Sequence, residues 1–214
     1  MNDKDIESYQ AIMFDFDGVL AECMDVKTEA FAQIYEPYGK DVVNKVVKHH
    51  VENGGISRYV KIKYYHEEYL KQQINEEQVE KIAKQFSDLV VDKVVKSDWV
   101  KGAKEFLEKN YKKIDMYVIS GTPEEELKKI VKKRNMEKYF KGVYGSPDTK
   151  PVILRRIITK KGYNPDKVMY IGDSLSDYRD SQKAEVKFLG RLLNESVSPF
   201  PRNTPEISDF SEII

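Results

Sequence analysis

Residues 11–18 read AIMFDFDG, and this stretch decides the fold of the chain. Its apolar run predicts a short buried strand over residues 11–16 that ends in a loop at Gly18. In a strand, residues two apart point to the same side. Asp15 and Asp17 are therefore expected to face one locus at the end of this strand.

Two carboxylates at one locus repel each other unless a cation lies between them or one is protonated. A divalent ion with oxygen ligands would remove the repulsion, and Mg²⁺ typically takes one or two carboxylates in addition to water and substrate phosphate. The alternative is an ordinary pair of loop carboxylates, Asp15 and Asp17, that accept hydrogen bonds from backbone amides. Residues elsewhere in the chain decide between these interpretations.

Four further apolar segments predict strands, and helical patterns separate them. Parallel strands need a helix-length connection, so this alternation predicts an α/β fold, a doubly wound, Rossmann-like parallel sheet with helices on both faces. Ligands of such sheets bind at the carboxyl ends of the strands. The predicted strands are 114–119, 142–145, 168–171 and 186–189, and the predicted helices are 102–110, 123–134, 150–160 and 175–184. The chain after Leu193, with three prolines, is expected to be irregular.

The stretch between the first two strands shows helical spacing throughout. We expect a bundle inserted after the first strand, so that residues 1–22 and 96–214 form the core domain and residues 23–95 form a helical domain. The many aromatic residues of the insert favour a bundle core over a binding site. Its predicted helices are 25–38, 41–52, 57–71 and 76–95.

The composition is that of a globular protein. The 214 residues hold 36 Lys and Arg against 36 Asp and Glu, which argues against a strongly basic nucleic-acid or membrane surface. No apolar run approaches the roughly 20 residues that cross a bilayer. The polar start and the single cysteine, Cys23, predict a cytoplasmic protein, and the sequon Asn194-Glu195-Ser196 is then accidental. The oligomeric state stays open.

Polar residues also follow the other predicted strands. Asp173 ends the fourth strand, and Asp177 lies one helical turn further on. Ser120-Gly121 follows the second strand, where a hydroxyl and an open amide suit a phosphate oxygen, although a simple turn is the alternative. Lys150 opens a helix, where a cation opposes the helix dipole unless it faces an anion.

These four features, in this order, resemble the haloacid dehalogenase superfamily of phosphatases and phosphomutases. Its first motif stands here as residues 15–20, DFDGVL, and its acidic motif as residues 172–177, GDSLSD. The insert resembles the helical cap of the subgroup that includes phosphoglycolate phosphatase and β-phosphoglucomutase. Residues 55–58, GISR, resemble the substrate loop of β-phosphoglucomutase, whereas Lys27 stands where many of these enzymes have a histidine.

The resemblance implies Mg²⁺-dependent phosphoryl transfer in which Asp15 is the nucleophile and Asp17 the acid and base. Magnesium would be held by Asp15, Asp17 through its carbonyl, and Asp173, with Asp177 orienting a ligand. Ser120 and Lys150 complete the catalytic set. The resemblance implies substrate contacts for Gly121, Thr122, Ser57, Arg58 and Lys27.

We therefore expect a phosphatase that acts on a small phosphorylated metabolite. A phosphomutase and a catalytically silent binding module are the alternatives. Arg58 is expected to face an acidic group of the substrate, and the alternative is a pair with a protein carboxylate. Cys23 is expected to be a buried filler, and His49, His50 and His66 to be cap surface or core without metal-ligand spacing.

Overall fold

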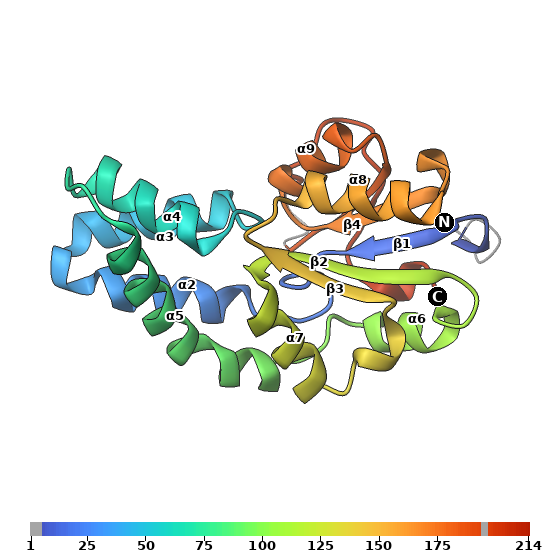
Figure 1. Ribbon diagram of the computed structural model, residues 1–214, viewed down its shortest axis with the longest axis horizontal. Helices are drawn as coiled ribbons and strands as arrows, with labels where there is room; N and C mark the ends of the chain where they lie inside the picture. The colour runs from blue at the N-terminus through green and yellow to red at the C-terminus, as the bar shows by residue number, and fades with distance from the viewer. Residues whose placement is uncertain (1–5, 194–196) are drawn as a thin grey trace.

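The computed structural model describes residues 6–193 and 197–214. A parallel six-stranded sheet forms its centre, with the strands in the order β3-β2-β1-β4-β5-β6 (Figure 1). The α/β prediction is confirmed, including the helical insertion after β1. The strands are β1 Ala11–Phe14, β2 Asp115–Pro123, β3 Gly142–Ser146, β4 Val168–Gly172, β5 Lys187–Arg191 and β6 Glu206–Ile207.

Strand β1 lies at the centre of the sheet and is fully buried. Phe14 pairs in register with Val118 of β2 and with Ile171 of β4. The residues that follow these three strands therefore meet at one edge, as expected for parallel neighbours.

Alternate residues of β1 belong to two cores, one on each face of the sheet. Figure 1 shows α8 and α9 on one face and α6 and α7 on the other. These helices are α6 Ala103–Asn110, α7 Glu124–Lys133, α8 Lys150–Lys161 and α9 Leu175–Lys183, and short 3₁₀ turns cover Glu137–Tyr139 and Pro165–Lys167.

The insert is a helical bundle that lies beyond the carboxyl ends of the strands, and we call it the cap (Figure 1). Phe31, Tyr35, Tyr65 and Phe86 fill its centre, whereas Tyr38 is 43% exposed. The cap elements are α2 Met24–Tyr35, a 3₁₀ turn Glu36–Tyr38, α3 Lys40–Glu52, α4 Arg58–Tyr64, a π-helical turn Tyr65–Tyr69 and α5 Glu76–Lys96. The predicted single helix over 57–71 is thus divided.

The chain near its end is more ordered than its prolines suggest. Residues 206–207 add β6 to the sheet, and a 3₁₀ turn covers Phe210–Glu212. Phe210 is buried with its ring centroid 5.3 Å from that of Phe106. The prediction of irregular chain is wrong here, because long-range packing fixes a segment whose local pattern is weak. The sequon lies outside the described residues.

None of the helices in the described part of the chain is long and apolar enough to cross a membrane.

Candidate active site

Asp15 lies one residue past the end of β1, and both its backbone and its side chain are held. Its N–H donates to the Ile171 carbonyl at 2.9 Å, which continues the pairing with β4. Its Oδ1 accepts the Phe16 N–H at 2.7 Å, and its Oδ2 accepts from Lys150 Nζ at 2.8 Å. The carboxylate is therefore fixed at the sheet edge.

Gly18 allows the Asp173 carboxylate to lie close to the loop that follows β1. Its φ is +71°, and a Cβ at this position would lie 2.3 Å from Asp173 Oδ2. A side chain here would need both a disfavoured backbone conformation and a displacement of Asp173. The glycine of the first motif is thus required by the approach of the loop after β4.

Lys150 begins α8 and points into the core with Nζ 2.8 Å from Asp15 Oδ2 and 2.5 Å from Asp177 Oδ1. Burial alone lowers the pKa of a lysine, but here the charges of Asp15 and Asp177 outweigh burial and raise it. The anions that Lys150 faces at the start of α8 are thus two protein carboxylates, those of Asp15 and Asp177.

Asp177 uses both carboxylate oxygens within the protein. Oδ1 accepts from Lys150 and from the Tyr170 hydroxyl at 2.9 Å, and Oδ2 accepts from Ser174 in a capping box at the start of α9. Burial raises the pKa of Asp177, but Lys150 and these hydrogen bonds outweigh it, so the pKa is lowered. Asp177 is thus ionised and positions Lys150.

Asp15, Asp173 and Asp177 offer carboxylate oxygens that all lie within 4.8 Å of one another. Asp173 Oδ2 is buried and has no hydrogen-bond partner within the described residues. Burial and the charges of neighbouring carboxylates raise the pKa of Asp173, and burial raises the pKa of Asp15 to about 7 despite Lys150. Hard oxygen donors, one of them unpartnered, suit a divalent cation such as Mg²⁺.

The Asp17 side chain turns away from this group. Oδ2 accepts from Lys27 Nζ at 2.5 Å and from the Thr122 hydroxyl at 3.2 Å, and Oδ1 accepts from the Cys23 thiol at 3.0 Å. Burial raises the pKa of Asp17, but Lys27 and these hydrogen bonds outweigh it and lower the pKa to about 2. Asp17 therefore offers the metal group only its backbone.

The end of β2 brings Ser120, Gly121 and Thr122 beside these carboxylates. The pairing of β2 with β3 is irregular between Ile119 and Pro123, which frees this segment from the regular ladder. The Ser120 hydroxyl lies 3.4 Å from Asp17 Oδ2 and accepts the Thr122 N–H at 3.1 Å. Lys27 Nζ also donates to the Thr122 hydroxyl at 3.0 Å.

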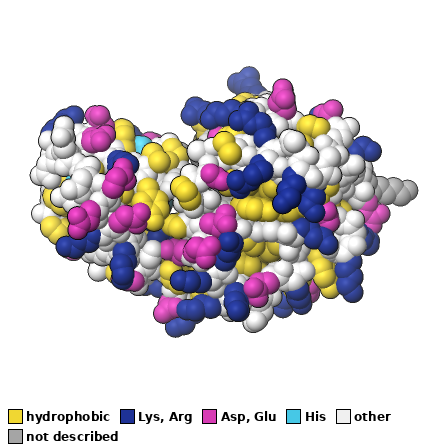
Figure 2. Space-filling model, viewed as in Figure 1, with side chains coloured by type: hydrophobic (Ala, Val, Ile, Leu, Met, Phe, Trp, Pro, Cys, Tyr) yellow, Lys and Arg dark blue, Asp and Glu magenta, His cyan; other side chains and the backbone are white. Residues whose placement is uncertain are grey.

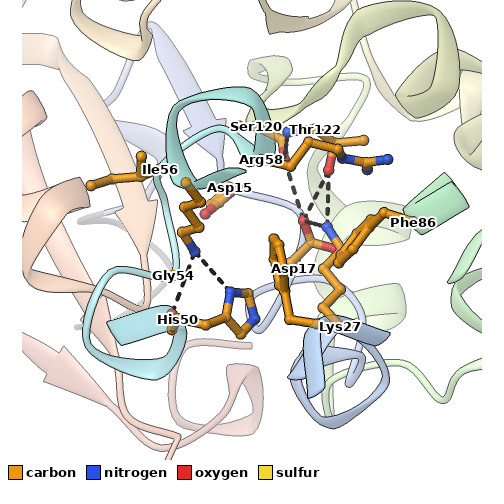
Figure 3. Close-up of a pocket in the computed structure, with 13 residues that line it drawn as sticks. Asp15, Asp17, Lys27, His50, Gly54, Ile56, Arg58, Phe86, Ser120 and Thr122 are labelled. Atoms are coloured by element: carbon orange, nitrogen blue, oxygen red, sulfur yellow. Dashed lines mark hydrogen bonds and ion pairs between the residues drawn. The ribbon is translucent and has the colours of Figure 1, made fainter. Parts of the chain in front are cut away.

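The cap loop of residues 53–57 lies directly on the core. A Cβ at Gly55 would lie 2.8 Å from the Ser176 hydroxyl, and a Cβ at Gly121 would lie 2.8 Å from the Gly55 carbonyl. Beneath this loop a cavity of about 30 Å³ lies between Asp15 and Asp17 of the core and His50 of the cap (Figure 3).

A larger pocket of about 670 Å³ opens beside this cavity, at the junction of cap and core, and reaches Ser120 and Lys150. Hydrophobic side chains gather on the surface at this junction (Figure 2). Ser57 lines this pocket where α4 begins, and the Ser57 side chain makes no capping hydrogen bond to α4.

Arg58 is buried and has a protein partner. Its guanidinium donates to both carboxylate oxygens of Glu126 on α7 and, at 2.7 Å, to the Ser87 hydroxyl on α5. It also lies over the Phe86 ring, 4.5 Å from the centroid. The anion that Arg58 faces is thus a protein carboxylate, and the arginine joins the cap to the core.

Lys61 and His50 also line the small cavity, from α4 and α3. Lys61 Nζ lies 2.8 Å from His50 Nδ1 and 3.4 Å from the His50 carbonyl. Both residues are buried. Neither is among the site residues predicted from the sequence.

A family model described as "Haloacid dehalogenase-like hydrolase" matches residues 12–191. This is most of the chain. The protein belongs to the haloacid dehalogenase-like hydrolases. The match runs from β1 to β5 and therefore includes every carboxylate of the candidate site.

A curated relative, the phosphorylated carbohydrates phosphatase of Thermotoga maritima, is 26% identical over 191 residues, which cover 83% of this chain and 82% of the relative.

Solved structures of other haloacid dehalogenase-like proteins share the fold. A Haemophilus somnus protein described as a predicted phosphoglycolate phosphatase has a TM-score of 0.74 at 17% identity and covers 96% of each chain. The β-phosphoglucomutase of Clostridium difficile has a TM-score of 0.75 at 15% identity and covers 95% of this chain and 92% of its own. A hydrolase of this family from Bacillus subtilis, bound to magnesium, has a TM-score of 0.70 at 16% identity, with 95% and 96% covered.

Four residues of this haloacid dehalogenase-like site are not among those predicted from the sequence: Tyr170, Glu126, His50 and Lys61. Tyr170 lies within an apolar strand, and Glu126 is one of three successive glutamates, so neither differs from its neighbours in the sequence. Lys61 had one weak signal in the sequence. It lies three residues after Arg58 and therefore on the same face of the helix, the face that was expected to meet the site.

Proposed function

We propose that this protein is a Mg²⁺-dependent phosphatase that hydrolyses the monoester of a small phosphorylated metabolite through an aspartyl phosphate on Asp15. The observation that supports it most is the buried group of Asp15, Lys150 and the unpartnered Asp173 at one sheet edge. A carboxylate nucleophile, a cation for phosphate oxygens and a place for a metal lie together there.

Asp15 would attack phosphorus and release the alcohol. Lys150, the Ser120 hydroxyl and the Gly121 amide would bind the oxygens on which charge accumulates during transfer. A magnesium ion held by Asp15, Asp173 and the Asp17 carbonyl, with Asp177 alongside, would offset the repulsion between Asp15 and the phosphate.

Asp17 would give a proton to the leaving oxygen and then take one from the water that frees Asp15. The pair with Lys27 keeps Asp17 ionised, which suits the second step. The first step needs a proton on Asp17, so substrate binding would loosen the contact with Lys27 and let Asp17 take that proton from solvent. The proton that Asp17 later takes from the attacking water restores this state for the next cycle.

The curated relative supports a phosphorylated carbohydrate as the first substrate class to test. A phosphomutase would use the same first step but return the phosphoryl group to an alcohol. A silent binding module would bind the same compounds without turnover.

The test is release of inorganic phosphate from a panel of sugar phosphates, phosphoglycolate and phenyl phosphate, with and without Mg²⁺. We expect phosphate release that needs Mg²⁺ and is lost in Asp15→Asn. Isomerised sugar phosphate without free phosphate would show a mutase, and unchanged substrates throughout would favour the binding module.

A further inference from the structure

Buried cations surround the candidate site, and their partners differ. Lys150 is paired with Asp15 and Asp177, Lys27 with Asp17, and Arg58 with Glu126. In each of these pairs the desolvation of both charges is offset by their mutual attraction.

Lys61 is a fourth buried cation at the site, and it differs from the other three because it has no paired carboxylate among the described residues. Its side chain is among the largest that are fully buried, with 1% of the residue exposed. In the described part of the chain no carboxylate lies within ion-pair distance of Lys61, and His50 is its hydrogen-bond partner. A buried cation without an anion is costly, which points to an anion that comes from outside the chain.

The contact with Lys61 fixes the protonation of His50. While Lys61 carries its charge, its ammonium group only donates, so His50 Nδ1 accepts and the ring proton lies on Nε2. Nε2 is buried and has no partner among the described residues. The cavity wall on the cap therefore presents two donors, Lys61 Nζ and His50 Nε2, and within the described chain neither has an acceptor of full negative charge.

The electrostatics of the pair agree with this geometry. Burial and the charge of Lys27 lower the pKa of Lys61 to about 7, and burial and the charge of Lys61 lower the pKa of His50 to about 2. Asp17, Asp173 and Lys150 of the core also act on Lys61, which places its charge close to the reacting groups. A bound anion would restore the full charge of Lys61.

We propose that Lys61 and His50 bind a second anionic group of the substrate, so that this protein prefers phosphate monoesters that also carry a carboxylate or a further phosphate. This inference rests on the proposed phosphatase function. Arg58, on the first turn of the same helix, is the more obvious candidate from the sequence, but its guanidinium already binds Glu126.

The test compares substrates that differ only in the second group. Phosphoglycolate and 2-hydroxyethyl phosphate form one pair, and glucose 1,6-bisphosphate and glucose 1-phosphate form the other. The measured quantity is the preference, the ratio of kcat/KM for the acidic member to kcat/KM for the neutral member. Whichever pair shows the larger preference identifies the anion as a carboxylate or a phosphate.

We expect the wild type to prefer an acidic member, and Lys61→Met to reduce that preference at least about tenfold, mainly through KM. Lys61→Arg should keep part of it, because the charge remains. Lys63→Met is the matched control, since Lys63 lies on the same helix with its side chain 40% exposed and paired with Glu76. It should leave the preference unchanged.

A preference that Lys61→Met leaves intact, or no preference in the wild type for either pair, would overturn the inference. The melting temperature at pH 6 separates binding from structure. Removal of an unpaired buried charge should raise it or leave it unchanged, whereas a lysine that serves only the fold would lower it.

Failure of the proposed function would look different. If the wild type releases no phosphate from any compound, calorimetric binding of the same four compounds to the wild type still tests Lys61. Tighter binding of an acidic member, lost in Lys61→Met and kept in Lys63→Met, would support the inference without turnover. Equal binding within each pair would overturn it.

Discussion

Two surfaces enclose the candidate site. The core edge is formed by the residues that follow β1, β2 and β4, and the cap wall is formed by Arg58, Lys61 and His50. The two surfaces differ in how their charges are paired. At the core edge Lys150 is matched by Asp15 and Asp177, which hold it from two sides. On the cap wall Arg58 binds the core through Glu126, and Lys61 has no anion in the described part of the chain. The core edge thus suits chemistry that every substrate shares, and the cap wall suits the part of the substrate that differs.

The largest effect should come from Asp15→Asn, which tests whether the core edge performs the chemistry. The amide is similar in shape but is neither nucleophilic nor anionic. We expect phosphate release to fall at least about a thousandfold on every substrate. Circular dichroism and the melting temperature should show a folded protein, and activity within tenfold of wild type would remove Asp15 from its role.

Lys150→Met tests whether the core edge depends on matched charge. The change leaves Asp15 and Asp177 buried without their cation, so we expect the metal-free protein to lose about 3 kcal/mol of stability at pH 7 in urea denaturation. The loss should shrink at pH 5, where Asp15 takes up a proton. Lys160→Met, an exposed change on the same helix, is the control, and equal losses in both variants would contradict the comparison.

The pH dependence of stability tests the metal group. The folded pKa of Asp15 is raised to about 7 and that of Asp173 is raised as well, so above about pH 4 these two groups hold more protons in the folded than in the unfolded state, and without metal they lower stability as the pH rises. His50, whose pKa is lowered to about 2, acts in the opposite direction over the same range. Because both proteins contain His50, the fall is measured in urea denaturation as the stability of the wild type minus that of Asp173→Asn, and this difference should decrease by on the order of 2 kcal/mol from pH 4 to pH 7.

Mg²⁺ should reverse that fall in the wild type and do so far less in Asp173→Asn. Without metal, Asp173→Asn should be as stable as the wild type or more so, because one repelling carboxylate is gone. If Mg²⁺ raises the melting temperature of both proteins equally, the metal lies elsewhere.

The smallest expected effect concerns Arg58. It tests whether Arg58 only joins the cap to the core while Lys61 binds the substrate. Arg58→Met and Glu126→Gln should each lower kcat/KM about threefold to tenfold, and the double variant should be little worse, because both break one contact. The loss should be equal for acidic and neutral substrates. A loss of kcat/KM that occurs only in Arg58→Met and only with acidic substrates would show that Arg58 also binds the acidic group of the substrate.

The core edge was predictable from the sequence because its residues come after strands. Asp15, Ser120 and Asp173 each stand directly behind a short apolar run, and neighbouring parallel strands bring the residues at their carboxyl ends to one edge. The same logic does not extend to the cap. Which face of α4 meets the cavity depends on how the bundle docks, so only the face that Lys61 shares with Arg58 separates it from exposed neighbours in the sequence. Glu126 lies on α7 of the core as one of three successive glutamates, and the sequence does not distinguish it from the other two.

The order of elements has a consequence for the synthesis of the chain. Strand β1 is made first and is apolar on both faces, yet its partners β2 and β4 come after the whole cap. At about 5–20 residues per second, β1 waits roughly 5–20 s for its first neighbour. During that interval the cap helices, whose contacts are local, can form while the strand that ends at the nucleophile keeps unpaired edges. An unpaired apolar strand can pair with another chain, so β1 is prone to aggregation until β2 has been made.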